Sequence, residues 1–223
     1  MPKLDASLHL DMLKTGKRAR SPAGRILKAV RILTAKKDVY GLEWGDPEQS
    51  PPLAYVRDQF LIPYVTEGNT VAEIGPGGGR WTRYMLDCDH IYALDYHQDL
   101  LDELNHNFGS DKLTTIKNNG DDFPGVPDGS VDFLYSFGVF VHLDLDIIDR
   151  YLSNMKRILK PGANVVLQYA DKNKPMAKQN DGFSDNNGEK MRALVTKNDF
   201  EIREEDEVTM WHSSIIRFGT AAE

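Results

Sequence analysis

The feature that most constrains this chain is a glycine-rich segment after a short apolar run, VAEIGPGGGR at residues 71–80. The β-branched start predicts a strand over 70–74, and the residues after the glycines predict a helix over 80–86. A loop with so few side chains lets a ligand approach main-chain N–H groups closely. Asp95 ends the next apolar run, twenty residues after Gly75, and is placed to accept hydrogen bonds from ribose hydroxyls. The segment therefore predicts a site for a nucleotide-like ligand.

The spacing of the glycines excludes two other nucleotide-binding loops. The dinucleotide fingerprint G-x-G-x-x-G needs a glycine three positions after Gly77, where this chain has Arg80. The phosphate-binding loop G-x-x-x-x-G-K-[ST] does not occur in the sequence. The pattern present is E-x-G-x-G-x-G, which begins at Glu73. It resembles motif I of the class I S-adenosylmethionine-dependent methyltransferases. A glycine-rich turn in another doubly wound domain is the alternative.

The resemblance implies that S-adenosylmethionine is the cofactor. In this family the glycine loop passes under the methionine part of the cofactor, and the acid that ends the second strand binds the ribose. The cofactor carries no pyrophosphate, and its ammonium group favours nearby acids. The residues expected to bind it are Glu73, Gly75, Pro76, Gly77, Gly79, Asp95, Tyr96, Gly120, Asp121, Asp122, Phe123, Ser136, Phe137 and Val139.

From residue 70 onward the chain alternates between strand-like and helix-like segments. Phe200–Val208 and Ser213–Phe218 are joined by too few residues for a crossover helix, so they predict an antiparallel hairpin. The fold class is therefore α/β, with a doubly wound, mostly parallel sheet of seven strands that ends in this hairpin. The other expected strands are 70–74, 91–95, 113–117, 131–136 and 163–169, and the helices are 80–86, 97–107, 146–159 and 187–197. A helix is also expected over 51–64, with Tyr55, Phe60 and Leu61 as buried candidates.

Three further segments match the same family in order. Residues 118–123, NNGDDF, follow the third strand. In the family an acid or amide here binds the adenine amino group, with Asp121 or Asp122 as the acceptor and Phe123 as a cover for the ring. An Asx turn is the alternative for this segment. The other two matches are PDGSVD at 127–132, which leads to SFGVFVHL at 136–143, and the turn KPG at 160–162, which is expected to be structural.

His142 is the side chain expected to take part in chemistry. In the family, residues just after the fourth strand line the methyl-transfer site. Histidine titrates near neutral pH, so it can take a proton from an acceptor hydroxyl. A role in orienting the loop is the alternative. Other acid–base candidates, each expected to be solvated or structural, are Asp144, Asp146, Tyr169, Asp171 and His212.

The charge of the chain is unevenly distributed. Residues 1–37 contain ten Lys/Arg and two Asp/Glu, whereas the other 186 contain seventeen and thirty-two. Residues 1–52 are expected to form a basic helical arm or lid, with a helix that begins at Ser21-Pro22. Residues 53–223 are expected to form the methyltransferase domain, with a polar insert over 171–188. The basic arm either attracts an anionic partner or packs against the acidic body. The residues expected to contact the acceptor are Tyr40, Trp44, Phe183 and Tyr169.

Composition bounds the remaining properties. The single cysteine, Cys88, excludes a disulfide framework, and the six histidines lack metal-ligand spacing, so no metal is expected. No apolar run approaches the length of a membrane span and no apolar signal core is present, which predicts a cytoplasmic protein. The expected partner is a small-molecule acceptor; nucleic acid is not expected, and a homo-oligomer is left open.

The expected function is methyl transfer from S-adenosylmethionine to an oxygen of a small polar acceptor, such as a sugar or a secondary metabolite. His142 and the polar insert favour an oxygen acceptor. The fourth strand does not end in [DNS]-P-P-[YFW], which argues against nucleobase amines. Three alternatives stay open: N-methylation, transfer to a macromolecule (peptide, RNA or lipid) recruited by the basic arm, and cofactor binding without catalysis.

Overall fold

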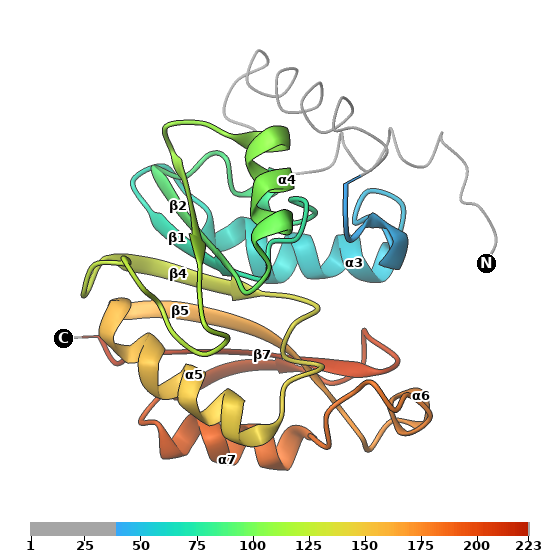
Figure 1. The fold of residues 1–223 in the computed structure, drawn as a ribbon. Coiled ribbons are helices and arrows are strands. Elements are labelled where there is room, and N and C mark those ends of the chain that lie inside the picture. The colour runs from blue at the N-terminus through green and yellow to red at the C-terminus, as the bar shows by residue number, and fades with distance from the viewer. Residues whose placement is uncertain (1–38, 223) are drawn as a thin grey trace.

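The computed structural model describes residues 39–222, so the basic arm over 1–37 and the helix expected from Ser21 lie outside the described residues. The described strands are β1 (Thr70–Ile74), β2 (His90–Asp95), β3 (Leu113–Lys117), β4 (Val131–Ser136), β5 (Leu159–Ala170), β6 (Glu201–Asp206) and β7 (Ser213–Gly219). They form one sheet in the order β3-β2-β1-β4-β5-β7-β6 (Figure 1).

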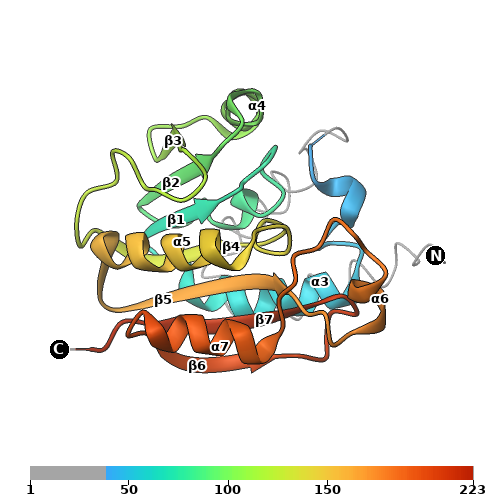
Figure 2. The same ribbon diagram turned by 60° about the horizontal axis from the view of Figure 1, so that its bottom comes forward.

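The sheet confirms the predicted fold class. The five strands β1 to β5 run parallel, whereas β7 is antiparallel to both β5 and β6. Val71 of β1 is paired with Ile91 on one side and with Phe133 on the other. The chain therefore winds outward from β1 to β3 and then returns to β4 on the other side of β1 (Figure 2). Ligands of doubly wound sheets bind at the carboxyl ends of the strands beside such a reversal.

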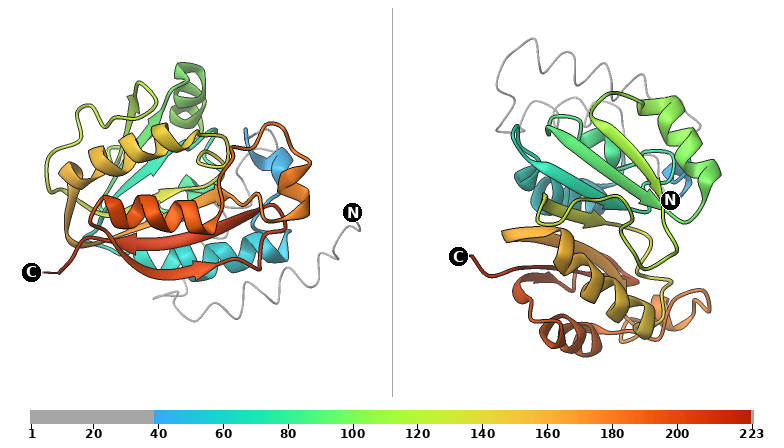
Figure 3. Two further views of the ribbon diagram at one scale, coloured as in Figure 1. Left: turned by 90° about the horizontal axis from the view of Figure 1, so that it is seen from below. Right: turned by 60° about the vertical axis from the view of Figure 1, so that its left-hand side comes forward.

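Helices cover both faces of the sheet (Figure 3). Leu152 and Val195 lie in the core between the sheet and one pair of helices, α5 and α7. Val56 and Leu104 lie in the core on the opposite face, under α3 and α4. The α-helices are α3 (Pro51–Val56), α4 (Gln98–Phe108), α5 (Leu145–Ile158), α6 (Pro175–Lys178) and α7 (Gly188–Lys197).

The helix expected over 80–86 is wrong in type. The segment consists of turns around one short 3₁₀ helix, η4 (Thr82–Tyr84). Trp81, Thr82, Arg83 and Tyr84 are all buried, so this segment has no face that could turn toward solvent. An amphipathic α-helix needs such a face.

The helix expected over 51–64 is present but changes its winding. After α3 it continues as a π turn, η2 (Arg57–Leu61), and ends as a 3₁₀ turn, η3 (Ile62–Tyr64). Pro63 has no N–H with which to continue an α-helical ladder. Phe60 is buried as expected, whereas Tyr55 is 46% exposed and does not belong to the core.

The fifth strand is longer than expected and contains the KPG segment, which was expected before it. Val131 of β4 is paired with Leu159, but Phe133 is paired with Asn164, so residues 160–163 bulge out of the ladder. Pro161 has no N–H to donate, and prolines within sheets are confined to edges and bulges.

The insert over 171–188 leaves the sheet at the carboxyl end of β5 and carries α6. Its two ends are joined, because Lys172 N donates to Asn186 O (2.8 Å). Ser184 N donates to Val141 O (2.9 Å), which holds the insert against the loop after β4. Residues 39–50 lie at the same end of the sheet in all views (Figures 1–3). Among the residues described, no helix has the length and hydropathy needed to cross a membrane.

Candidate active site

The candidate site lies where the chain leaves the carboxyl ends of β1, β2 and β3. Two main-chain hydrogen bonds connect these ends. Gly75 N donates to Leu94 O (2.8 Å), and Asn118 N donates to Asp95 O (3.0 Å). The loops after the three strands therefore start from a fixed base.

The glycine loop makes two close approaches that a side chain would block. Gly75 has φ 70°, and a Cβ there would lie 2.1 Å from Val139 Cγ2. The loop after β1 thus touches the loop after β4. Gly77 has φ 54°, and its Cβ would lie 3.0 Å from Tyr40 Cδ1. Gly78 N also donates to Tyr40 O (3.3 Å), so Tyr40 covers the main chain around Gly77. The sequence had suggested that this main chain is bare.

Tyr40 belongs to residues 39–50, which we call the strap. Tyr40 N donates to Glu103 Oε1 (2.9 Å), and further along the strap Asp46 forms an ion pair with Arg83. The rings of Tyr40 and Trp44 meet edge to face at 5.2 Å and are 43% and 62% exposed. The strap is therefore fixed at both ends and presents two aromatic rings at its surface.

Asp95 ends β2 and is buried. Its Oδ1 accepts a hydrogen bond from His97 N (2.9 Å) and lies 3.3 Å from His97 Nδ1. Within residues 39–222, Oδ2 has no hydrogen-bond partner. Partial burial raises the pKa of Tyr40, with the nearby carboxylates of Glu43 and Asp95 adding to the rise. The strap thus places Tyr40 close to Asp95.

The two aspartates after β3 have different surroundings. Asp122 uses both oxygens within its own loop, because Oδ1 accepts from Asn119 N (2.8 Å) and Oδ2 accepts from Asn119 Nδ2 (2.7 Å). Asp121 accepts from Arg150 Nε (2.5 Å) through Oδ2 alone. Asp121 is therefore the better candidate for the adenine amino group. Asp122 closes the loop onto Asn119, and the Asx turn of this segment is made by Asn118, whose Oδ1 accepts from Gly120 N (3.2 Å).

The aromatic residues expected beside the adenine also differ. Phe123 is only 2% exposed and packs edge to face with Tyr151 at 5.8 Å, so most of its ring belongs to the core. Tyr96 is 59% exposed, and its Cδ2 lies 3.8 Å from the position of a Cβ on Gly120. Of the two rings, Tyr96 is the one with free surface next to the loop after β3.

The loop after β4 is fixed by buried polar groups. Ser136 Oγ donates to Ile74 O (2.9 Å), which ties the end of β4 to β1. Gly138 N donates to Gln168 Oε1 (2.8 Å), and Gln168 Nε2 donates to Ser213 Oγ (2.7 Å). Phe137 is buried, with its ring 4.7 Å from that of Trp81. The residues expected to line the methyl-transfer site therefore have fixed main-chain positions.

Comparison with known proteins agrees with this geometry. Residues 72–167 match the family described as methyltransferase domain. Solved structures of S-adenosylmethionine-dependent methyltransferases share the fold. Residues 72–167 match a methyltransferase domain, and the described structure has the fold of class I S-adenosylmethionine-dependent methyltransferases. A search of curated protein sequences gave no match.

The likeness between this chain and solved methyltransferase structures extends beyond residues 72–167, at low sequence identity. The Mesorhizobium loti methyltransferase has a TM-score of 0.65 and 14% identity, covering 80% of this chain and 100% of its own. The Aquifex aeolicus methyltransferase has a TM-score of 0.57 and 18% identity, covering 86% and 97%. The Methanosarcina mazei methyltransferase has a TM-score of 0.60 and 15% identity, covering 74% and 98%. Together, family and fold support S-adenosylmethionine as the cofactor.

The groups at the carboxyl edge of the methyltransferase domain fit this cofactor. A glycine-rich loop, a positioned carboxylate at Asp95 and an exposed ring at Tyr96 suit a methionine part, a ribose and an adenine, respectively. Across the described range, no group of three His, Cys, Asp or Glu side chains could hold a metal ion.

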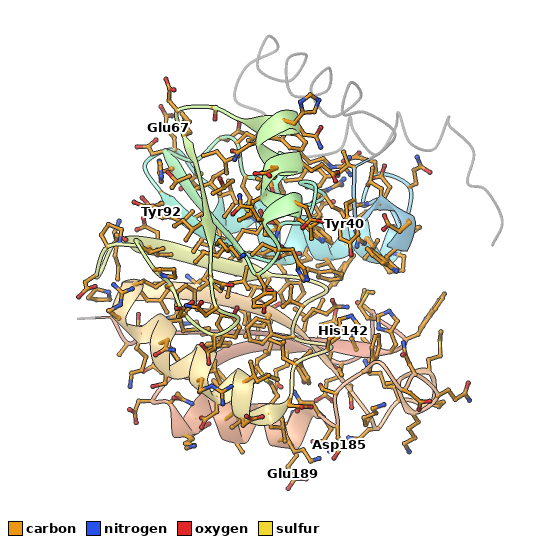
Figure 4. The ribbon with its side chains drawn as sticks, in the orientation of Figure 1. Tyr40, Glu67, Tyr92, His142, Asp185 and Glu189 are labelled. Atoms are coloured by element: carbon orange, nitrogen blue, oxygen red, sulfur yellow. The ribbon has the colours of Figure 1, made fainter. Side chains whose placement is uncertain are left out.

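His142 lies at the same edge of the domain as Tyr40 (Figure 4). Its Nδ1 is 2.7 Å from Gly182 O. A carbonyl oxygen only accepts, so Nδ1 carries the proton and Nε2 of the neutral ring keeps its lone pair. The insert thus selects the tautomer of His142, which is the state a base requires.

Three segments distant in sequence meet beside His142. The Phe183 ring lies 5.4 Å from His142 and 5.3 Å from His212, edge to face in both cases. Burial lowers the pKa of His212, and the nearby Lys174 lowers it further, so this ring is neutral near pH 7. Tyr169 was expected to contact the acceptor, but it is fully buried in the core. Phe183 is therefore better placed than Tyr169 to contact an acceptor.

Glu73 is buried under the glycine loop. Its Oε2 accepts a hydrogen bond from Thr82 Oγ1 (2.5 Å). Burial raises the pKa of Glu73 to about 8, against a smaller lowering by that hydrogen bond. Glu73 is therefore mostly protonated at neutral pH and supports the loop rather than offering a charge to the cofactor.

Sequence reasoning missed Gln168 and Glu103. Gln168 interrupts the apolar run of β5, and a buried polar side chain in a strand signals a required hydrogen bond. Glu103 lies on the exposed-looking face of α4, and no local pattern reveals that the strap reaches it.

Proposed function

We propose that this protein transfers a methyl group from S-adenosylmethionine to an oxygen of a small polar acceptor. The observation that carries the proposal is the hydrogen bond from His142 Nδ1 to Gly182 O, which leaves Nε2 as a proton acceptor at the edge where the cofactor is expected. S-adenosylmethionine, when bound, supplies a methyl group carried by a sulfonium. The sulfur leaves as a neutral thioether, so no acid is needed.

On this proposal the cofactor is held by main chain and by a few polar groups. The glycine loop lies under the methionine part, Oδ2 of Asp95 accepts from a ribose hydroxyl, and Asp121 accepts from the adenine amino group. Tyr96 supplies a ring beside the base. The catalytic contribution of these residues is orientation, which is worth several kcal/mol in a displacement that requires three atoms in line.

The acceptor is proposed to lie between the strap and the insert. Trp44 and Tyr40 are the exposed rings of the strap, and Phe183 of the insert packs against His142. Aromatic surfaces that cover the acceptor exclude water and strengthen electrostatic interactions at the reacting atoms. His142 Nε2 then takes the proton of the acceptor hydroxyl as the oxygen forms its new bond.

The test is product analysis with the full chain. The protein is first titrated with S-adenosylhomocysteine to establish binding, and then incubated with methyl-labelled S-adenosylmethionine and a fractionated metabolite extract. We expect the label on an oxygen of a small molecule, located by mass spectrometry and NMR. A label on nitrogen or on a macromolecule would contradict the acceptor assignment. Binding without any labelled product would contradict catalysis.

A further inference from the structure

One buried guanidinium beside the glycine loop lacks a counter-ion. Arg80 is 7% exposed, and no carboxylate within residues 39–222 forms an ion pair with it. Its Nη2 lies 3.4 Å from Trp44 O, and its Nε has no hydrogen-bond partner in the described structure. Two neighbouring arginines differ, because the buried Arg83 pairs with Asp46 and the partly buried Arg57 pairs with Glu48.

Aromatic rings hold the Arg80 guanidinium in place. Its central carbon lies 5.4 Å from the ring centre of Trp81 and 5.7 Å from that of Phe137. Such contacts orient a guanidinium without neutralising its charge. The carboxylates of Glu43 and Asp46 are near but engaged, by Gly41 N (2.7 Å) and by Arg83, respectively.

Two more donors without partners lie in the same cluster. Trp81 Nε1 and the Tyr135 hydroxyl are buried and, within the described part of the chain, make no hydrogen bond. The two rings are 5.5 Å apart. Burial raises the pKa of Tyr135 well above its usual range, so its hydroxyl keeps the proton. Unpaired buried donors next to an unpaired cation indicate a missing acceptor with negative charge.

We propose that Arg80 binds the carboxylate of the methionine part of the cofactor. This inference rests on the proposed function. Of the three charged groups in S-adenosylmethionine, the sulfonium and the ammonium are positive and are repelled by Arg80, whereas the carboxylate matches the planar fork of the guanidinium. Arg80 directly follows the glycine loop after β1, and Asp95 ends β2, the strand paired with β1. The methionine part therefore runs toward Arg80 and the ribose toward Asp95.

The test compares ligands with and without the carboxylate by titration calorimetry. Wild-type protein and Arg80→Met are titrated with S-adenosylhomocysteine and with decarboxylated S-adenosylmethionine. Loss of a charge-assisted hydrogen-bond pair should weaken the first ligand about 10- to 100-fold in the variant. The second ligand should change less than about 3-fold, because it has no carboxylate for Arg80 to bind.

Arg83→Met is the matched control, since Arg83 is an equally buried arginine of the same segment with a carboxylate partner. It should not change the affinity ratio of the two ligands. Arg80→Lys keeps the charge and should restore part of the preference for the carboxylate. Melting temperatures establish that each variant is folded, and Arg80→Lys serves alone if Arg80→Met does not fold.

The outcomes separate this inference from the proposed function. An equal loss of affinity for both ligands in Arg80→Met would show that Arg80 only contributes to packing, and would overturn the inference. Unchanged affinity for S-adenosylhomocysteine with a raised KM for the acceptor would assign Arg80 to an anionic acceptor instead, which also overturns it. Failure of the wild-type protein to bind either ligand would refute the proposed function itself.

Discussion

The two sides of the carboxyl edge are held by different interactions. On the β1–β3 side, main-chain hydrogen bonds such as Gly75 N to Leu94 O fix the loops. On the β4–β7 side, side chains do this work: Gln168 fixes Gly138, and Phe183 of the insert packs between two histidines. The side proposed to bind the cofactor therefore depends on backbone geometry, and the side proposed to bind the acceptor depends on packing between segments far apart in sequence. Changes on one side should leave the other largely intact.

His142→Ala gives the sharpest test of that separation. Loss of a general base should lower kcat by about 100- to 10,000-fold, with unchanged affinity for S-adenosylhomocysteine. Steady-state kinetics and calorimetry measure the two quantities. His90→Ala, at the amino end of β2 where His90 meets Thr114, is the control and should retain activity. Unaltered turnover in His142→Ala would reduce His142 to a residue that orients its loop.

Gly75→Ala tests the contact between the two sides. The new Cβ would meet Val139, at a φ that L-residues rarely adopt, so the free energy of unfolding should fall by about 2–5 kcal/mol in urea titrations. Gly125→Ala is the matched control, because Gly125 has φ 74° but nothing within 4 Å of its Cβ position. It should lose only about 1–2 kcal/mol. The double variant Gly75→Ala/Val139→Ala should recover the difference, and equal losses in the two single variants would deny the contact.

Asp95→Asn should weaken S-adenosylhomocysteine about 10- to 100-fold, because a carboxylate that accepts ligand hydrogen bonds becomes a neutral amide. Calorimetry measures this change. Asp99→Asn, on the exposed start of α4, should bind as the wild-type protein does. Wild-type affinity in Asp95→Asn would place the ribose elsewhere.

Glu73→Gln should change how stability depends on pH. Burial raises the folded-state pKa of Glu73 to about 8 from its ordinary 4.5, so the folded protein holds a proton that the unfolded chain releases. The wild-type protein should therefore lose stability as pH rises from about 4.5 to about 8. Relative to Glu73→Gln, we expect a loss on the order of 5 kcal/mol across this range by urea unfolding, since each pKa unit corresponds to about 1.4 kcal/mol. Glu67→Gln, at the exposed amino end of β1, should follow the wild-type curve, and parallel curves for all three proteins would mean that Glu73 is ionised.

The sheet was predictable because its signals are local. The strands over 70–74, 113–117 and 131–136 are confirmed residue for residue, and the hairpin followed from the short link before Ser213. Alternation of short apolar runs with amphipathic helices leaves few other topologies. The segment over 80–86 failed because burial on all sides, from packing against α3 and β4, overrides a local helical pattern.

The site was predictable only in part. Motif spacing found the glycine loop and Asp95, since both follow strands that lie side by side. It did not separate Asp121 from Asp122, which differ through the partners Arg150 and Asn119. Motif spacing also did not predict the hydrogen bond between Gly78 and Tyr40 of the strap, because only folding brings these two residues together. The roles assigned to individual site residues stay predictions.

The hydrogen bond between Lys172 and Asn186 has a practical consequence. It closes the insert at its neck, so the residues beyond that neck can be shortened or exchanged without moving β5 or α7. Variants changed between positions 173 and 181 keep the contacts of Gly182 with His142 and of Ser184 with Val141, so they would test whether this segment sets the proposed acceptor preference.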